Sequence, residues 1–253
     1  MKQASISFEP NNFPCLADEI VLPDYDGNTQ YRNGKRFYAN PDGDYLPSIS
    51  TVMGYDPEKE KKLEEWRERV GHDQAAKITK QSQDYGTLMH ESLEHYLSND
   101  MDALHKEFAD IPKTEQYIPM GMFNVMKQFC DKNVEGVYHQ ERPVYSNTLG
   151  IAGRFDVLCK MNGVPVLMDF KNSRRRKKKE YVQSYILQST AYATIITEHT
   201  GIEIEWFVIP VVTFDGELQV FTGKVSDHKQ DMKDQVRRYY NEVGGAERNE
   251  NTK

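Results

Sequence analysis

Residues 153–171 read GRFDVLCKMNGVPVLMDFK, a pattern typical of two β-strands joined by a tight turn. The dipeptide Asn162-Gly163 suits a two-residue hairpin turn, and apolar residues alternate with other residues on either side of it. With this turn, the register counted outward brings Asp156 opposite Asp169. Two carboxylates at cross-strand distance repel each other, so we expect a compensating cation at this point.

A lysine completes the polar group on this hairpin. Lys171 follows Asp169 by two residues and therefore lies on the same face of its strand, opposite Arg154. Mg²⁺ or Mn²⁺ would turn the repulsion into coordination, because these cations take oxygen ligands and keep waters free for a phosphate. Lys171 would then help to deprotonate a water or stabilise charge on a scissile phosphate. On the triplet 169–171 alone, a solvated polar face is the commoner explanation.

The rest of the chain alternates between helical and extended patterns. Asn33-Gly34 predicts a second hairpin over residues 29–39, and residues 86–97 carry apolar side chains at helical spacing. We expect further helices at 58–83, with a break near Gly71, at 101–132, with interruptions near Pro112 and Pro119, at 181–199, and at 226–243 with Ser226 as N-cap. We expect strands at 134–145, 151–161, 164–171 and 203–213.

These elements predict a mixed α/β protein in which an N-terminal helical region precedes an antiparallel sheet with one crossover helix. The length of 253 residues is sufficient for one large domain, which we place at residues 1–243, followed by a flexible polar tail at 244–253. No apolar run is long enough to span a bilayer, and residues 1–14 lack the pattern of a signal or transit peptide. We therefore expect a cytoplasmic protein without a membrane partner.

Charge and cysteine content exclude several other classes of protein. The net charge is −7, and removing the six positive charges of residues 174–179 leaves −13 on the rest of the chain. An acidic body with one basic block indicates a focused site for an anion. Cys15, Cys130 and Cys159 are widely spaced and form no C-x-x-C pair, which argues against a disulfide framework, a zinc site and an iron–sulfur cluster.

Further motifs occur in a fixed order around the hairpin. They are Gly86-Thr87-Leu88-Met89-His90, Gly153-Arg154-Phe155-Asp156, Asp169-Phe170-Lys171 and Gln188-x-x-x-Tyr192. Together they resemble the PD-(D/E)XK nuclease superfamily, and specifically its RecB-like exonuclease branch. Residues 46–52, LPSISTV, and the triplet Trp66-Arg67-Glu68 are similar to mitochondrial genome maintenance exonucleases and their phage relatives. The resemblance covers about residues 30–225.

The resemblance implies a restriction-endonuclease-like core at about residues 84–225, with a mixed central sheet flanked by helices. It implies that His90, Asp156, Asp169 and the backbone carbonyl of Phe170 bind the metal, and that Lys171 is catalytic together with both aspartates. By itself, a histidine beside an apolar helical stripe is more often a packing or surface residue. Mg²⁺ or Mn²⁺ is the implied cofactor, with no iron–sulfur cluster.

Gln188 and Tyr192 lie four residues apart on the predicted helix 181–199, and the resemblance implies that they hold the substrate strand. The alternative is an amphipathic helix that packs its aromatic rings on the sheet. For Gln188 this alternative is weaker, because an amide on the core side needs a hydrogen-bond partner.

Four residues are weaker candidates for the site. Glu141 would contact the metal through water or pair with an arginine, and Glu94, one turn after His90, would orient the imidazole or be solvated. Arg154 is implicated by its position opposite Lys171. Ser173 follows Asn172, which stands where related nucleases commonly carry Thr, so contacts beside the catalytic residues differ here.

The basic block follows the Lys171 strand directly. Runs of this kind are usually solvated loops or localisation signals. Next to a phosphate-cleaving centre, however, Arg174, Arg175, Arg176 and Lys177 would attract a nucleic-acid backbone. The expected partner is DNA, single-stranded or with free ends, and a replication or recombination protein is a further expected partner.

The sequence therefore predicts a metal-dependent DNA exonuclease that acts in replication, recombination, repair or degradation of DNA in a bacterium or a phage-infected cell. The exonucleolytic action rests on the resemblance alone. A structure-specific or nicking endonuclease is an alternative, and so is an inactive nucleic-acid-binding module. An inactive module would usually have lost the costly pair of like charges.

Overall fold

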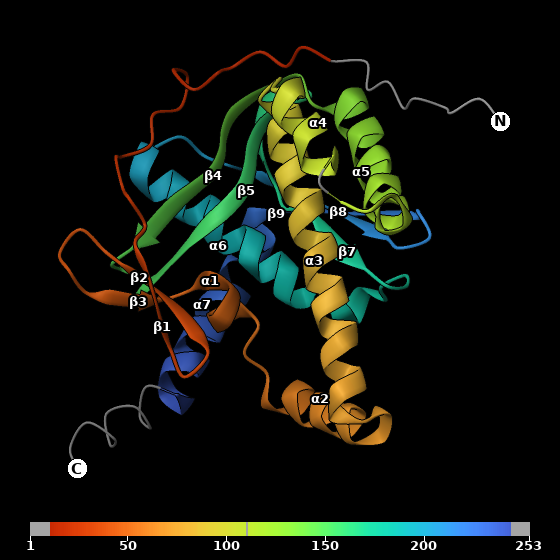
Figure 1. Ribbon diagram of the computed structural model, residues 1–253. Helices are drawn as coiled ribbons and strands as arrows, with labels where there is room; N and C mark the ends of the chain where they lie inside the picture. Colours follow the sequence, from red (N-terminus) through yellow and green to blue (C-terminus); the bar gives the residue numbers. More distant parts are fainter. Residues whose placement is uncertain (1–10, 110, 244–253) are drawn as a thin grey trace.

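The computed structural model describes residues 11–109 and 111–243 (Figure 1). The predicted tail at 244–253 lies outside the described residues. The strands are β1 Thr29–Arg32, β2 Lys35–Ala39, β3 Tyr45–Pro47, β4 Gly136–Ser146, β5 Ile151–Met161, β6 Val164–Met168, β7 Lys171–Ser173, β8 Trp206–Thr213 and β9 Leu218–Lys224. The helices are α1 Ile49–Met53, α2 Pro57–Val70, α3 His72–Leu97, α4 Met101–Ala109, α5 Lys113–Asn133, α6 Gln183–Thr200 and α7 Val225–Glu242, with a short 3-10 helix at Lys179–Tyr181.

The central sheet is mixed, as the resemblance implies. Strands β4, β5 and β6 are antiparallel neighbours, β6 and β7 both run parallel to β8, and β9 is antiparallel to β8. The prediction of an antiparallel sheet is wrong at β6 and β8, because the crossover helix α6 returns the chain to the same edge in the same direction. β1, β2 and β3 form a separate antiparallel sheet.

Two layers of helices cover the two faces of the central sheet (Figure 1). One apolar core joins α1, α6 and α7 to side chains such as Phe155, Leu158 and Phe207. The other joins α3, α4 and α5 to Val157, Cys159 and their neighbours. This three-layer arrangement confirms the predicted α/β fold class. Within the described residues, every helix is too short or too polar to cross a membrane.

Both predicted hairpin turns are present. In the β5–β6 hairpin, pairs run from Met161 opposite Val164 to Val157 opposite Met168, which confirms the predicted register. Asn33, Gly34, Asn162 and Gly163 all have positive φ, as a type I′ turn requires. These short-range signals are reliable because they depend on only a few neighbouring residues.

Several element boundaries differ from those predicted. The break at Gly71 is present, where φ is +88°, but α3 then runs without interruption through residue 83 to Leu97. Pro119 lies inside α5 and does not interrupt it. Ser226 is not the N-cap of α7, which begins one residue earlier at Val225. The sequence patterns missed β3, α1 and β9. β3 and β9 are antiparallel partners of the preceding strands β2 and β8, and α1 packs against α6 and α7.

Candidate active site

The hydrogen-bonded pairing of β5 with β6 ends at Val157 and Met168. We call the point where the two strands separate the fork, and the candidate site lies beside it. After Met168 the chain stays with β8, because the Asp169 amide donates to the Val208 carbonyl over 3.0 Å. The predicted pairing of Asp156 with Asp169 is therefore wrong. Instead, the Asp156 carboxylate accepts a hydrogen bond of 2.7 Å from the Phe170 amide across the opening.

The β5 strand also changes face at this point. Phe155 belongs to the core under α6, whereas Val157, two residues on, belongs to the core under α3. A regular strand would keep both side chains on one face, so the twist is exaggerated at Asp156. The predicted pairing of Arg154 opposite Lys171 is absent as well, since the β5–β6 ladder ends at Val157 and Met168 and Lys171 pairs with Val211 of β8.

Three metal-binding side chains converge beside the fork. His90 of α3, Glu141 of β4 and Asp156 of β5 offer ligand atoms that all lie within 4.8 Å of one another. The Nδ1 atom of His90 is 3.5 Å from Oδ2 of Asp156. In the described part of the chain, Asp169 does not belong to this group, although sequence reasoning placed it there and gave Glu141 a minor role.

Glu141 reaches the group through an irregular backbone. Gln140 pairs with Val157 and Arg142 with Phe155, so Glu141 lies across from Asp156, and its φ is +46°. Burial raises the pKa of Glu141 from 4.5 to about 8, and repulsion from Asp156 and Glu94 adds to the shift. A non-glycine residue with positive φ and a costly charge is most often retained where function requires it.

Asp169 and Lys171 form a buried pair next to the group. The Nζ atom of Lys171 lies 2.6 Å from Oδ2 of Asp169, whose side chain is 2% exposed. Burial raises the pKa of Asp169 to about 7, with Lys171 opposing the shift and Asp156 adding to it. Burial would lower the pKa of Lys171, but attraction to the two aspartates outweighs it and raises that pKa.

The donor set fits a divalent cation. Two carboxylates and one imidazole converge there, and among the described residues Oδ1 of Asp169 is buried without a hydrogen-bond partner. Buried carboxylate oxygens normally have a donor or a cation, so an unsatisfied one beside like charges indicates a missing positive charge. The predicted role of the Phe170 carbonyl stays a prediction; the Phe170 ring packs edge-on against His90.

A groove of about 1080 Å³ leads to this group. One side of its wall comes from α2 and α3, including Glu94, and the other from the β1–β2 hairpin and Arg154. Asn172 also lines it and ties β7 to α3 through a hydrogen bond of 3.0 Å from its amide to the Ser82 carbonyl. Gly86 permits this approach, because a Cβ there would lie 3.0 Å from the Asn172 side chain.

Gln188 and Tyr192 reach the groove from α6. Burial raises the pKa of Tyr192 well above 10, repulsion from Asp169 and Asp156 adds to this, and a hydrogen bond with Gln188 opposes it. Gly153 of β5 provides room for the ring, because a Cβ there would lie 2.7 Å from the tyrosine hydroxyl. The two predicted strand-binding residues thus lie together, next to the carboxylates.

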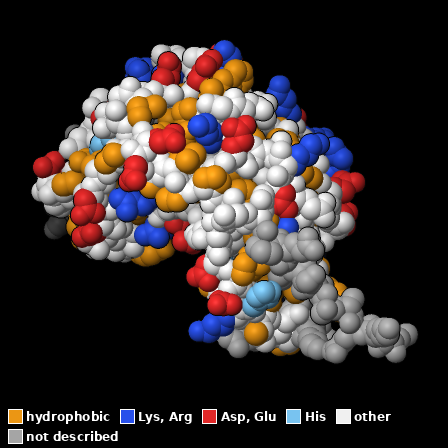
Figure 2. All heavy atoms as spheres, turned by 90° about the horizontal axis from the view of Figure 1, so that it is seen from above, with side chains coloured by type: hydrophobic (Ala, Val, Ile, Leu, Met, Phe, Trp, Pro, Cys, Tyr) orange, Lys and Arg blue, Asp and Glu red, His pale blue; other side chains and the backbone are white. Residues whose placement is uncertain are grey.

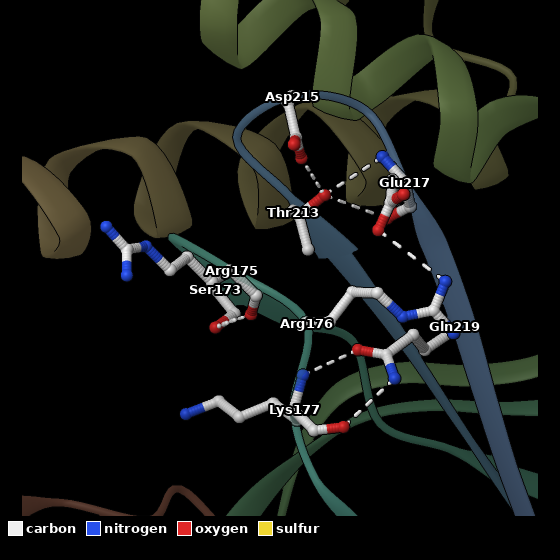
Figure 3. A network of polar contacts seen from close by, with 8 residues as sticks. All are labelled: Ser173, Arg175, Arg176, Lys177, Thr213, Asp215, Glu217 and Gln219. Carbon is white, nitrogen blue, oxygen red and sulfur yellow. Dashed lines mark hydrogen bonds and ion pairs between the residues drawn. The ribbon is translucent and has the colours of Figure 1, made fainter.

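The basic block borders the groove without lining it, since Arg174 donates to the Gln81 side chain of α3 over 3.3 Å and the Lys177 ammonium lies 5.9 Å from the Tyr185 ring. Figure 3 shows it against the β8–β9 turn, where Arg176 pairs with Glu217 at 3.6 Å and the Lys177 backbone exchanges hydrogen bonds with the Gln219 amide. Ser173 donates to the Arg175 carbonyl and does not line the groove either. The four basic residues predicted to bind substrate are absent from the groove lining in the described part of the chain.

Sequence reasoning missed one cation that does line the groove, Arg36 of β2. It lies two residues after the Asn33-Gly34 turn, in an exposed hairpin that combines aromatic and basic side chains. That composition was a usable signal for nucleic-acid binding. It was overlooked because nothing local indicates that this hairpin folds over a site more than a hundred residues further along the chain.

Comparison with known protein families shows to which family the chain belongs. The model of the PD-(D/E)XK nuclease superfamily matches residues 61–253, which is more than half of the sequence. The chain belongs to this superfamily. The residues of the fork and of α6 lie inside the matched region, whereas the β1–β2 hairpin, which lines one side of the groove, lies outside it.

Two solved structures show a distant similarity to part of the chain. A candidate exonuclease from Eubacterium rectale is 15% identical, with a TM-score of 0.42, and the match covers 61% of this chain and 65% of that one. The chain thus spans less than two thirds of that protein. SSO0001 is 14% identical, with a TM-score of 0.29 and coverage of 58% and 72%. No curated protein matches the sequence significantly.

Proposed function

We propose that this PD-(D/E)XK protein is a metal-dependent DNA exonuclease that hydrolyses phosphodiester bonds. The observation that carries the proposal is the strand fork, which brings His90, Glu141 and Asp156 next to the buried Asp169–Lys171 pair. Exonucleolytic action and the RecB-like branch are supported by the sequence motifs. The setting that we propose is DNA replication, recombination, repair or degradation in the cytoplasm of a bacterium or a phage-infected cell.

In this proposal, His90, Glu141 and Asp156 hold Mg²⁺ or Mn²⁺, and Asp169 adds its unsatisfied oxygen to the site. A divalent cation held by these residues would supply Lewis-acid chemistry, activating water for attack and offsetting charge on the phosphate. The Phe170 amide fixes the orientation of the Asp156 carboxylate by donating to its Oδ2 atom. The same Oδ2 atom lies 3.5 Å from Nδ1 of His90, so the bond holds the carboxylate toward the other candidate ligands.

The raised pKa of Lys171 keeps its side chain protonated at neutral pH, which limits the roles that it can have in catalysis. A lysine that stays protonated at neutral pH is a poor base, so of the two roles considered from sequence we favour the stabilisation of charge. Its ammonium would donate to a phosphate oxygen on which charge develops in the transition state. Asp169 holds the ammonium in place at 2.6 Å, and the Tyr185 ring lies 5.4 Å from it.

The first experiment incubates the protein with end-labelled DNA, single- and double-stranded, linear and circular, and with an RNA of the same sequence. We expect linear DNA to be degraded with Mg²⁺ or Mn²⁺ and to survive in EDTA. Lys171→Ala should reduce the rate by about 10²–10³-fold, because it removes a donor to the transition state. Lys160→Ala, in the same sheet but away from the groove, is the matched control.

The outcomes separate the candidate functions. Cleavage of circles would replace the exonuclease with an endonuclease, and preferential loss of RNA would overturn the choice of substrate. DNA binding without any cleavage under either metal would leave the inactive binding module as the function.

A further inference from the structure

The β1–β2 hairpin presents one face to the groove. Thr29 pairs with Tyr38 and Tyr31 with Arg36, and all four side chains line the groove. Tyr38 is buried, whereas Tyr31 is 67% exposed. Exposed tyrosines also occur elsewhere on this protein, but a ring inside a groove beside the candidate metal site is placed to stack on a ligand with flat faces.

Two arginines on this side of the groove have no acidic partner. Among the described residues, neither Arg36 nor Arg154 has a carboxylate oxygen within ion-pairing distance, although both lie close enough to Glu141 to lower its pKa. The guanidinium of Arg36 is held over the Tyr38 ring at 5.3 Å from its centroid. Unpaired, oriented guanidinium groups next to a metal site are suited to bidentate binding of a phosphate.

A second aromatic ring lines the groove from α2. This helix contains no buried residue, and it contributes Leu63 and Trp66 to the groove. Figure 1 shows α2 and the hairpin as separate elements at the lower end of the molecule, and residues of both line the groove. The groove therefore combines cations near the carboxylates with two aromatic side chains on different elements.

We infer that the β1–β2 hairpin and α2 form a clamp for an unpaired nucleic-acid strand. Arg36 and Arg154 bind the phosphate next to the scissile one, and Tyr31 and Trp66 stack on bases further along the strand. Stacking on a side chain needs an uncovered base face, and inside a duplex both faces of a base are covered by neighbouring bases. The clamp rests on the proposed function, because it supplies substrate to the same metal site.

Trp66 allows a direct test without catalysis. The chain has two tryptophans, so Trp206→Phe leaves Trp66 as the sole indole. In EDTA, a single-stranded oligothymidylate should quench its fluorescence saturably, and a blunt hairpin duplex of equal length should not. Absence of quenching, or equal quenching by the duplex, overturns the clamp.

Affinity measurements test the hairpin. In the Lys171→Ala background, fluorescence anisotropy with a labelled single strand should show Tyr31→Ala raising Kd by about tenfold, with Tyr31→Phe close to the parent. Arg36→Ala should also lower the slope of log K against log salt by about 0.7, since one phosphate contact is lost. A Kd for Tyr31→Ala equal to that of the parent overturns the clamp.

Tyr45→Ala and Arg32→Ala are the matched controls. They lie in the same three-stranded sheet, where the Arg32 guanidinium stacks on the Tyr45 ring at 4.8 Å, and neither lines the groove. Both should bind the single strand like the parent, and losses equal to those of the groove variants would overturn the clamp. Because these assays need no cleavage, an inactive wild-type protein that still shows the pattern would refute the nuclease but not the clamp.

Discussion

At the scale of single residues, the decisive feature is the concentration of acidic groups that the fold keeps out of water. Glu141 and Asp169 have pKa values raised to about 8 and about 7, in each case chiefly by burial. Asp169 is fully buried, and Glu141 is partly buried beside Asp156 and Glu94, whose charges repel its own. A cation that binds only the folded protein would remove the cost.

This predicts how stability depends on pH. Both carboxyl groups bind protons more tightly in the folded state than in the unfolded state, where their pKa values are near 4. The stability that they contribute is complete below pH 4 and is lost as pH rises through 7 to 8. Without metal, the Tm should be higher at pH 6 than at pH 8.5, and Mn²⁺ should raise it most at pH 8.5, as measured by scanning fluorimetry.

Glu141→Gln tests the origin of the effect. It should flatten the Tm difference between pH 6 and pH 8.5 without metal, and it should shrink the stabilisation by Mn²⁺. Glu203→Gln, an exposed carboxylate outside the groove, should change neither quantity. An unchanged pH dependence in Glu141→Gln would refute the role assigned to this residue.

At the scale of elements, the site depends on how closely α6 approaches β5. Tyr192 packs over Gly153, where a Cβ would meet the tyrosine hydroxyl at 2.7 Å and the Ile49 side chain at 3.2 Å. Because Tyr192 and Ile49 are both buried, neither can move aside freely. The glycine of the second sequence motif is therefore explained by packing between layers.

Gly153→Ala should destabilise the protein by about 1–3 kcal/mol, as overpacked cores do, in a urea denaturation experiment. Tyr192→Phe removes the hydroxyl oxygen that lies nearest to the added Cβ. The loss of unfolding free energy in the double variant should therefore be smaller than the sum of the losses in the two single variants. Gly121→Ala in α5 is the control, since no atom lies within 4 Å of its Cβ and alanine favours the helix. Strict additivity would contradict this packing explanation.

At the scale of the whole molecule, positive charge lies both inside the groove and along its border. On the face shown in Figure 2, basic and acidic side chains are interspersed. The basic block lies against the β8–β9 turn, whereas Arg36 and Arg154 lie in the groove. With an overall charge of −7, long DNA needs such local positive surfaces to approach the protein.

The double variant Arg174→Ala, Arg175→Ala should weaken binding of long DNA in the Lys171→Ala background and reduce the salt dependence of that binding. A short single strand that fills only the groove should bind as before, because these arginines do not line it. Lys106→Ala, Lys233→Ala removes the same charge from exposed sites on α4 and α7 and serves as control. Equal losses on short and long strands would place the block inside the binding groove.

The sequence by itself determined the local features of this protein. The Asn-Gly turns, the β5–β6 register and the helical spacing of 86–97 depend on neighbouring residues, and all three are found in the structure. The motifs also indicated the superfamily, which the family match shows.

Only the tertiary structure decided which side chains meet. β6 leaves β5 after Met168 and stays hydrogen-bonded to β8, and there Asp169 pairs with Lys171 while Asp156 lies beside Glu141 and His90. The basic block hydrogen-bonds to β9 next to the β8–β9 turn, and Arg36 lines the groove. Such choices depend on competition between strands and layers far apart in the chain, and no short pattern in the sequence encodes that competition.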